Sequence, residues 1–510
     1  MNAGMGGGMS AGQVLLVATL ALPAVGALVV ALLPRRVERG ARVAGTVAAA
    51  LAFGTSVVLY GGRAWAVGFE GGAPVVQPWY EVRADWVPFL DLSFHLGVDG
   101  ISYPLVVLTT LLTLLCCLYT VRHSPEPGGR GRTLVALLLV VEVGIVGTFL
   151  ALDLVLFFVF FEVVLLPMFA IIAGWGGEGR RHAARKFVLY TLLGSVLLLV
   201  GVFVVVTAAG TADIVALTGG EQLSRTTQLV AFTFLALAFA VKAPLWPLHT
   251  WLPDAHTEAP TVGSVILAGV LLKMGTYGLV RLGVGVTPEA AAWAAPVLGT
   301  LAVAAIIVGA LVCLAQTDLK RLIAYSSVGH MGFVLLGIAT LSAAGIQAAL
   351  IGNIAHGVIT GLLFFLAGAI KDRAHTGELA RLGGLREHAP VLAGLLGFGA
   401  IASLGLPGLA GFWGEMFAVV AAFQRGGGLW LVLGVVAAVG AALTAAYFLR
   451  LLRRVSHGPP ALPAVAALTR PELVAWSPLV VLALAVGLLP ALVLGMAYDP
   501  VGALAAVVPS

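Results

Sequence analysis

The sequence holds few charged residues and only three cysteines. Asp, Glu, Lys and Arg make up 10% of its 510 residues, whereas about a quarter of a soluble globular domain is charged. The spacing of Cys116, Cys117 and Cys313 fits no iron–sulfur, haem or zinc site. A glycine-rich phosphate loop after a predicted strand is also missing. We therefore expect a chain outside the soluble class, with no redox cofactor or nucleotide of its own.

Long apolar runs fill the sequence instead. Hydrophobic residues make up 60% of the chain, and runs of roughly twenty recur along its whole length. Each such run can cross a hydrocarbon core of about 30 Å as a helix. The first run has no basic residue before it, so it lacks the charged start of a cleavable signal peptide. We expect one polytopic bundle with a retained first span.

The runs predict fourteen membrane spans. They lie near 13–33, 43–62, 97–121, 133–151, 154–175, 185–208, 227–252, 259–283, 292–315, 322–341, 345–370, 391–423, 428–452 and 475–497.

The basic residues predict how these spans are oriented, because cytoplasmic loops collect Lys and Arg. With the N-terminus outside, 21 of the 28 basic residues fall in cytoplasmic loops. Five fall on the other side, namely Arg63, Arg83, Arg225, Arg281 and Arg425. Both termini are therefore predicted on the non-cytoplasmic side, with a plasma membrane of the bacterial type around the chain. The net charge of +5 needs no nucleic-acid partner to explain it.

Two lysines and several other titratable residues fall inside the predicted spans. A charge at the centre of a membrane helix costs about 2.5–3.5 kcal/mol on insertion scales, so such residues usually have a function. A buried Lys can release its proton, whereas Arg stays protonated. The intramembrane residues are Lys242, Lys273, Glu142, Glu162, Glu415, His330 and His356.

Each of these residues also has a structural interpretation. Lys242 and Glu162 would form a static ion pair, and each histidine would join two helices by a hydrogen bond. For Glu142 the structural and functional interpretations have equal weight. Lys186 stands at the start of its span, where a lysine that only sets orientation is as plausible as a functional one.

Two spans are predicted to be broken. Pro244 and Pro247 follow Lys242, and Pro407 with nearby glycines precedes Glu415. Irregular backbone at membrane depth is tolerated only where it is buried in protein or lines a cavity. Each broken span is the fourth of a set of five, and an odd number of spans places two copies in opposite orientations. Paired interruptions of this kind indicate a transport site between inverted repeats.

These observations combine into one fold prediction. We expect an all-α polytopic membrane protein with about 14 transmembrane helices, two inverted five-helix repeats and two broken helices. Residues 1–132 would hold the first three helices, 133–283 the first repeat, 284–452 the second, and 453–510 a cytoplasmic loop and the last helix. The buried acid, lysine and histidine residues would then form a proton pathway across two half-channels.

At the broken span the sequence becomes specific for a family. The stretch FAVKAPLWPLHTWLPDAHTEAPTVGSVILAGVLLKMGTYGLVR resembles the signature of the antiporter-like membrane subunits of respiratory complex I, NADH:quinone oxidoreductase. AQTDLKRLIAYSSVGHMGFVL, HLGVDGISYPLVVLTTLL and the AHG around His356 are similar to the same family. Glu415 in GFWGE, where paralogues carry Lys, and the early end of the chain favour the subunit M type (mitochondrial chain 4 type).

The resemblance implies a role for each site residue. Glu162 and Lys242 would be the pair of the first half-channel. Lys273, His330 and His356 would link it to the second, and Glu415 would serve the exit. Glu142 matches no family position and stays outside this set. The family implies no cofactor in this subunit, because NADH, flavin, iron–sulfur clusters and quinone belong to its partners.

The expected partners are the other membrane subunits of complex I, above all the L and N types, and the lipid bilayer. Two alternatives stay open at this point. One is a subunit of a multisubunit Na⁺/H⁺ antiporter or membrane-bound hydrogenase, which shares the fold, Lys242 and Glu162. The other is a membrane scaffold whose buried charges serve only assembly.

Overall fold

The structure of the chain is a computed structural model that describes residues 9–61, 75–90, 92–123, 130–459, 461 and 466–509. Within these residues, twelve helices are long and apolar enough to cross a membrane, and two further spans are divided into shorter helices. The expected all-helical membrane fold is therefore confirmed. Arg63, expected in a loop, lies outside the described residues.

The helices follow the order of the predicted spans. The first half contains α1 (Ala11–Leu32), α2 (Glu38–Val58), α3 (Tyr103–Arg122), α4 (Gly131–Leu150), α5 (Leu154–Val163), α6 (Leu165–Trp175), α7 (Arg180–Ala209), α8 (Ile214–Leu217), α9 (Arg225–Lys242), α10 (Trp251–Glu258), α11 (Thr261–Ile266) and α12 (Leu272–Gly278). The second half contains α13 (Pro288–Ala315), α14 (Leu319–Ala339), α15 (Ala343–Ala374), α16 (Leu385–His388), α17 (Pro390–Ser403), α18 (Ala410–Arg425), α19 (Gly427–Val455), α20 (Arg470–Leu488) and α21 (Ala491–Ala506).

Side-chain caps fix where several of these helices begin. Ser224 accepts a hydrogen bond from the backbone N–H of Thr227 at the start of α9. Asp318 does the same for Arg321 in α14, and Ser342 for Gly345 in α15. Such caps satisfy the free N–H groups of the first turn. They set the start of the helices that later place the site residues.

Both predicted breaks are present. α9 ends at Lys242 and helix resumes only at Trp251, and α17 ends at Ser403 before α18 begins at Ala410. The span that follows the first break is irregular in another way. It contains two π-helical segments, η4 (Leu267–Leu271) and η5 (Leu279–Val284), on either side of α12. π-helical turns are rare and occur often at functional sites.

Two features at the ends of the bundle differ from the prediction. A hairpin of β1 (Tyr80–Val87) and β2 (Leu92–Val98) precedes α3, so the span expected to start near residue 97 starts at Tyr103. The last span, expected at 475–497, is divided into α20 and α21. The hairpin is stabilised by backbone pairing between the strands, which a search for apolar runs cannot detect.

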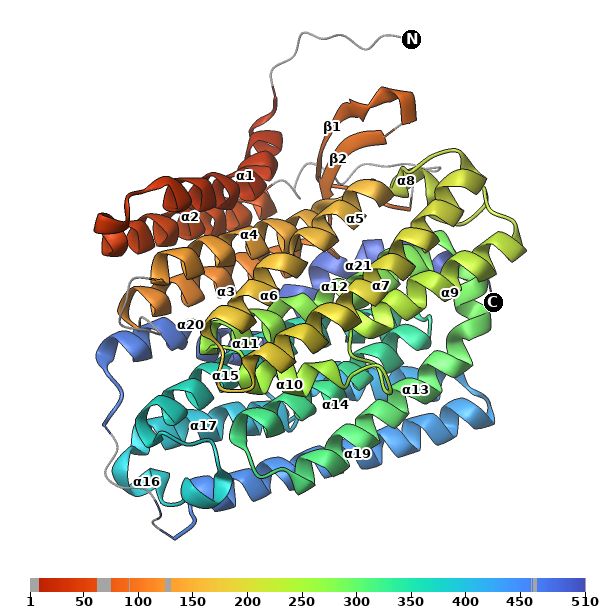
Figure 1. Cartoon of the computed structure of the whole chain (residues 1–510). Helices are drawn as coiled ribbons and strands as arrows, with labels where there is room; N and C mark the ends of the chain where they lie inside the picture. The colour runs from red at the N-terminus through yellow and green to blue at the C-terminus, as the bar shows by residue number, and fades with distance from the viewer. Residues whose placement is uncertain are drawn as a thin grey trace.

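The loops gather at two opposite ends of the bundle. The hairpin end carries β1, β2 and the loop of residues 210–224, which Arg83 and Asp213 join at 2.7 Å (Figure 1). The basic end carries the loops 33–37, 176–179, 316–318, 375–389 and 456–459. Backbone bridges and side chains connect several of these loops, such as Asp318 with Glu378. The loops that the charge pattern assigned to the cytoplasmic side thus lie together at one end of the bundle.

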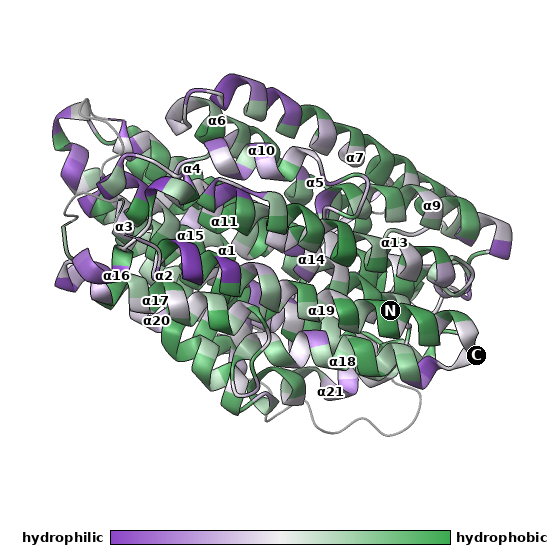
Figure 2. Cartoon of the chain, turned by 90° about the horizontal axis from the view of Figure 1, so that it is seen from below, coloured by the Kyte–Doolittle hydropathy of each residue, from purple (hydrophilic) through white to green (hydrophobic). Residues whose placement is uncertain are grey.

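The outer helices expose apolar side chains, and the middle of the bundle is buried. α1 and α2 form one edge, and α13 and α19 form another (Figure 1). Leu193 and Phe203 of α7 and Val439 of α19 are more than half exposed, as a lipid-facing surface requires. Hydrophobic colour covers most of the outer helices in Figure 2. By contrast, the span Thr261–Val284 is buried along almost its whole length.

Candidate functional site

Lys242 is the last residue of α9, and its side chain is buried. Its Nζ lies 4.5 Å from the centroid of the Phe161 ring on α5. The carbonyl of Val241, which the end of the helix leaves free, accepts a hydrogen bond from Trp251 Nε1 at 3.0 Å. The indole therefore satisfies one carbonyl released by the break and fixes the position of the lysine.

Glu162 lies beside Phe161 on the same helix. Its side chain is half-buried, and its Oε1 is buried without a hydrogen-bond partner. Its charge acts on the Lys242 ammonium, but that ammonium faces the aromatic ring. The structure thus places the two expected partners in one region without a direct hydrogen bond between them.

Lys273 is held between the two π-helical segments and is fully buried. Its Nζ donates to the backbone carbonyl of Ala268, five residues earlier, at 2.5 Å. The same Nζ lies 2.6 Å from Nδ1 of His356 on α15. The π-helical geometry thus directs the lysine toward the histidine of α15.

Glycine brings the span of Lys273 close to the end of α9. A Cβ at Gly275 would lie 2.7 Å from the backbone nitrogen of Ala243 and 2.8 Å from the carbonyl oxygen of Phe239. No other residue leaves room for this approach. The two lysine-bearing helices are therefore in backbone contact next to Lys242.

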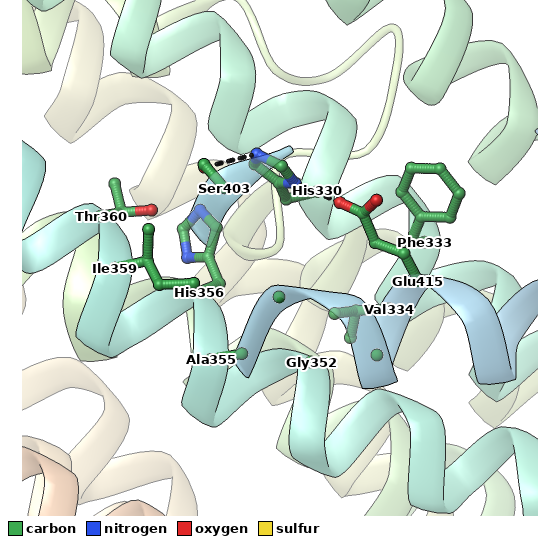
Figure 3. A pocket seen from close by; sticks show the side chains of 12 residues that line it. His330, Phe333, Val334, Gly352, Ala355, His356, Ile359, Thr360, Ser403 and Glu415 are labelled. Carbon is green, nitrogen blue, oxygen red and sulfur yellow. Dashed lines mark hydrogen bonds and ion pairs between the residues drawn. The ribbon is translucent and has the colours of Figure 1, made fainter. Parts of the chain in front are cut away.

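His330 and Glu415 form the other half of the site. His330 Nδ1 lies 2.7 Å from Glu415 Oε1, and His330 Nε2 lies 3.1 Å from Ser403 Oγ (Figure 3). These residues come from α14, α18 and α17, so the second break supplies two of the three. A Cβ at Gly414 would lie 2.5 Å from Gly352, which shows how closely α18 approaches α15.

A small cavity lies between the two histidines. The ring centroids of His330 and His356 are 5.8 Å apart, and Figure 3 shows both rings beside the cavity. Its volume of about 20 Å³ is enough for one water molecule. His356 Nε2 is buried and has no hydrogen-bond partner. The cavity therefore separates a lysine–histidine contact from a histidine–glutamate contact.

Comparison with known proteins shows the family to which this chain is similar. The family model described as NADH:quinone oxidoreductase/Mrp antiporter, TM matches residues 151–440. The chain is 43% identical to NADH-quinone oxidoreductase subunit M of Rhodobacter capsulatus over 84% of both chains. It is 44% identical to NAD(P)H-quinone oxidoreductase chain 4 1 of a Synechococcus strain, over 74% of this chain and 72% of the relative.

A solved structure agrees with these relatives. A chain in the respiratory complex I of Thermus thermophilus is 30% identical and superposes with a TM-score of 0.85. The match covers 97% of this chain and all of that one. The chain belongs to the subunit M, or chain 4, family of NADH-quinone oxidoreductase. It is an antiporter-like membrane subunit of that enzyme complex, as the sequence motifs predicted.

Sequence reasoning missed one histidine of this subunit. His256 of α10 is fully buried, and neither of its ring nitrogens has a hydrogen-bond partner. Its ring stacks on Phe364 of α15 with centroids 4.5 Å apart, and the charges of Lys320 and Lys273 both act on it. Its position in the stretch after the broken helix is the sequence feature that could have identified it as a candidate site residue.

Lys320 is a second addition, because the sequence assigned it to a loop. In the structure it is buried in the first turn of α14, and its Nζ donates to the carbonyl of Ala259 at 3.0 Å. It lines a cavity of about 400 Å³ at the basic end, together with polar side chains that include Glu258 and Asp372. A polar space therefore extends from the basic end to a buried lysine.

Arg281 corrects the sequence assignment in the same way. It was counted with the loops but lies inside η5, almost fully buried. Its Nη2 donates to Asp99 Oδ2 at 2.5 Å, and its Nε donates to the hydroxyl of Tyr277 at 3.3 Å. The predicted span 259–283 already contained this position, so the error was to count the arginine with the loops because of its charge.

Glu142 is buried in α4, and neither of its carboxyl oxygens has a hydrogen-bond partner. Its carboxyl group is near the thiol of Cys117 on α3. None of the contacts described above includes it. Among the described residues, His, Cys, Asp and Glu side chains nowhere form a group of three that could hold a metal ion.

Proposed function

We propose that this subunit moves protons across the membrane through two half-channels joined by a buried line of lysine, histidine and glutamate. One observation carries the proposal. Lys273 contacts His356 at 2.6 Å, His330 contacts Glu415 at 2.7 Å, and a cavity with room for one water separates the two contacts. Each group can accept and release a proton, and all four are inside the bundle.

The chemistry of these groups supports a relay. An ammonium donates to an imidazole nitrogen, and an imidazole protonated on one nitrogen can release a proton from the other. Water in the cavity would carry the proton from His356 to His330. Glu415 would then receive it and pass it toward the exit.

The first half-channel would use Glu162 and Lys242. Because α9 and the span of Lys273 are in backbone contact, we expect a change of charge on Lys242 to influence Lys273 through the low-dielectric interior. Glu162 would draw positive charge back to Lys242 after transfer. The cavity beside Lys320 would supply protons from the basic end, with His256 next along the route.

We propose that energy for this transfer comes from other subunits, which oxidise NADH and reduce quinone. The L and N types of antiporter-like subunit would be the neighbours in the membrane. The basic end would face the cytoplasm, and both termini would lie on the other side of the plasma membrane.

A substitution of Lys273 tests the proposal. Lys273→Met keeps a long side chain but cannot hold a proton. NADH-driven pumping into inverted vesicles should therefore fall to a small fraction of the normal rate. NADH oxidation is measured in parallel, and a native gel checks assembly. Arg185→Met removes a charge at an exposed position of α7 and should change none of these readings.

A second variant separates proton transfer from a structural charge. Lys273→Arg keeps the positive charge but does not release a proton. The proposal expects an assembled complex that pumps poorly. Normal pumping by Lys273→Arg or by an assembled Lys273→Met would contradict it, and loss of assembly in Lys273→Met with full pumping in Lys273→Arg would support a scaffold role.

A further inference from the structure

The span of Lys273 contacts α15 at more points than the lysine itself. Gly357 of α15 directly follows His356, and a Cβ at Gly357 would lie 2.6 Å from the carbonyl oxygen of Gly269 in η4. The backbones of the two helices are therefore in contact on the η4 side of the lysine–histidine pair. A single contact of this kind sets the distance between two helices but leaves them free to rotate or tilt about it.

A hydrogen bond provides a second point of attachment. Thr276 stands three residues after Lys273 on α12, and Asn353 stands three residues before His356 on α15, so each pair shares a helix face. The single hydrogen of the Thr276 hydroxyl is shared between Oδ1 of Asn353, at 3.1 Å, and the backbone carbonyl oxygen of Lys273, at 3.2 Å. Both side chains are buried. One hydroxyl therefore connects Asn353 to the backbone of the lysine.

The lysine contact determines where His356 carries its proton. Nδ1 lies 2.6 Å from Lys273 Nζ, whereas Nε2 has no hydrogen-bond partner and the ring lines the small cavity. A ring nitrogen that accepts from an ammonium carries no proton, so the neutral ring carries its proton on Nε2. The proton that this ring can release is thus on the nitrogen that no protein group occupies.

We propose that Asn353 is a positioning residue for proton transfer, because through Thr276 it keeps Lys273 against Nδ1 of His356 and leaves Nε2 available to water. In the transfer, the lysine ammonium gives a proton to Nδ1, and Nε2 gives its proton to a water in the cavity. The lysine is then neutral, and the imidazole is again neutral with its proton on Nδ1. This inference rests on the proton route proposed above and adds a residue that carries no proton itself.

Loss of the hydrogen bond has a kinetic consequence. The backbone contact at Gly357 would remain, so the two helices would stay together. The lysine and the histidine would no longer be held at the distance that transfer requires. A misplacement of about 1 Å can slow a reaction roughly a hundredfold. Transfer from Lys273 would then become the slowest step of transport.

Two substitutions test this role. Thr276→Val and Asn353→Leu remove the hydrogen bond with little change in side-chain size, and both are prepared in the whole complex with assembly checked on a native gel. We expect NADH-driven pumping into inverted vesicles to be several-fold slower than in the parent. The ratio of the pumping rates in H₂O and D₂O should also rise, because a proton transfer now limits the rate. The combined variant should pump no worse than the slower single variant, since both changes break one bond.

Two further variants separate the hydrogen bond from packing. Thr276→Ser keeps the hydroxyl and loses only a methyl group, so its pumping should stay close to normal. Thr110→Val is the matched control, because the buried Thr110 hydroxyl also contacts carbonyls of its own helix and lies 2.8 Å from Ser56 Oγ on α2. That bond joins α2 to α3, so its loss should leave both the pumping rate and the isotope ratio unchanged.

Every other outcome counts against the positioning role. Normal pumping with an unchanged isotope ratio in assembled Thr276→Val and Asn353→Leu overturns it, even where Lys273→Met stops pumping and the proposed function stands. Slower pumping with an unchanged isotope ratio, or an equal loss in Thr276→Ser, would show an effect of packing and overturn it as well. Failure of Thr276→Val and Asn353→Leu to assemble would assign the bond to stability alone. Normal pumping by Lys273→Met refutes the proposed function by itself.

Discussion

The buried lysines and histidines have different contacts from the buried arginine. Among the described residues, the buried ones inside the helices are Lys242, Lys273, Lys320, His256, His356 and Arg281. The lysines and histidines contact carbonyls, rings or one another, and only Arg281 is fixed by a carboxylate within 4.0 Å. Within this group, the side chains that can exchange protons have no carboxylate partner, and the one that cannot is paired; His330, slightly more exposed, is the histidine that pairs with a carboxylate, Glu415.

Glu415 gives a prediction at this scale. Glu415→Gln keeps the size of the side chain and a hydrogen bond to His330, but it cannot take up a proton. We expect normal assembly and a large fall in NADH-driven pumping, measured with a pH-sensitive dye in inverted vesicles.

A neighbouring residue supplies the control for Glu415. Ser403→Ala removes only a neutral hydrogen bond to the same histidine, which contributes roughly 1 kcal/mol. Pumping should therefore stay close to normal in this variant. If Ser403→Ala reduced pumping as much as Glu415→Gln, the geometry of His330 and not the carboxyl group would be decisive.

At the scale of elements, the interruptions of the helices decide where the site residues lie. α9 stops at Lys242, two π-helical segments flank Lys273, and a break precedes α18 with Glu415. Regular helices would leave no free carbonyls and would turn these side chains to other faces. The breaks therefore do more than mark the site, because they create its geometry.

The contact between the two lysine-bearing helices gives a prediction for this scale. Gly275→Ala adds a methyl group that meets backbone atoms of Ala243 and Phe239, which cannot move aside independently. Overpacking of this kind costs roughly 1–3 kcal/mol. We expect a lower melting temperature of the complex and reduced pumping, measured by thermal unfolding and dye assay.

Gly394→Ala is the matched control, because a Cβ at Gly394 of α17 meets nothing within 4 Å. Alanine also favours helix by up to about 1 kcal/mol over glycine. Its melting temperature should stay equal or rise slightly. A fall in both variants would point to a general effect of the exchange and not to the helix contact.

The sequence predicted the breaks and spans because their causes are local. Proline after Lys242 ends a helix whatever its neighbours are, and apolar length predicts a span. Contacts between distant residues escaped it. His330 and Glu415 are 85 residues apart, and no spacing rule indicates that they touch. The hairpin was missed because pairing between strands leaves no long apolar run. The π-helical segments were missed because an apolar run does not show which type of helix it forms.

At the scale of the whole molecule, charge is divided between the two ends. The loops rich in Lys and Arg meet at the basic end, and the hairpin end holds few basic residues. From the positive-inside rule we predict that the basic end faces the cytoplasm. The fold itself is compatible with either direction, so this orientation rests on charge alone.

Cysteine labelling tests this orientation. The three native cysteines are buried and free, so they add little background. Phe89→Cys introduces a thiol at a side chain 91% exposed at the hairpin end, and Arg386→Cys introduces one at an exposed site of the basic end. In intact spheroplasts, a membrane-impermeant maleimide should label Phe89→Cys and leave Arg386→Cys unlabelled.

Inverted vesicles provide the reciprocal measurement, because they expose the cytoplasmic face. There Arg386→Cys should react and Phe89→Cys should not. The reverse pattern in both preparations would show that the subunit has the opposite orientation in the membrane. The large cavity beside Lys320 would then open to the outside, and the direction of transport proposed for Lys273 and Glu415 would be reversed with it.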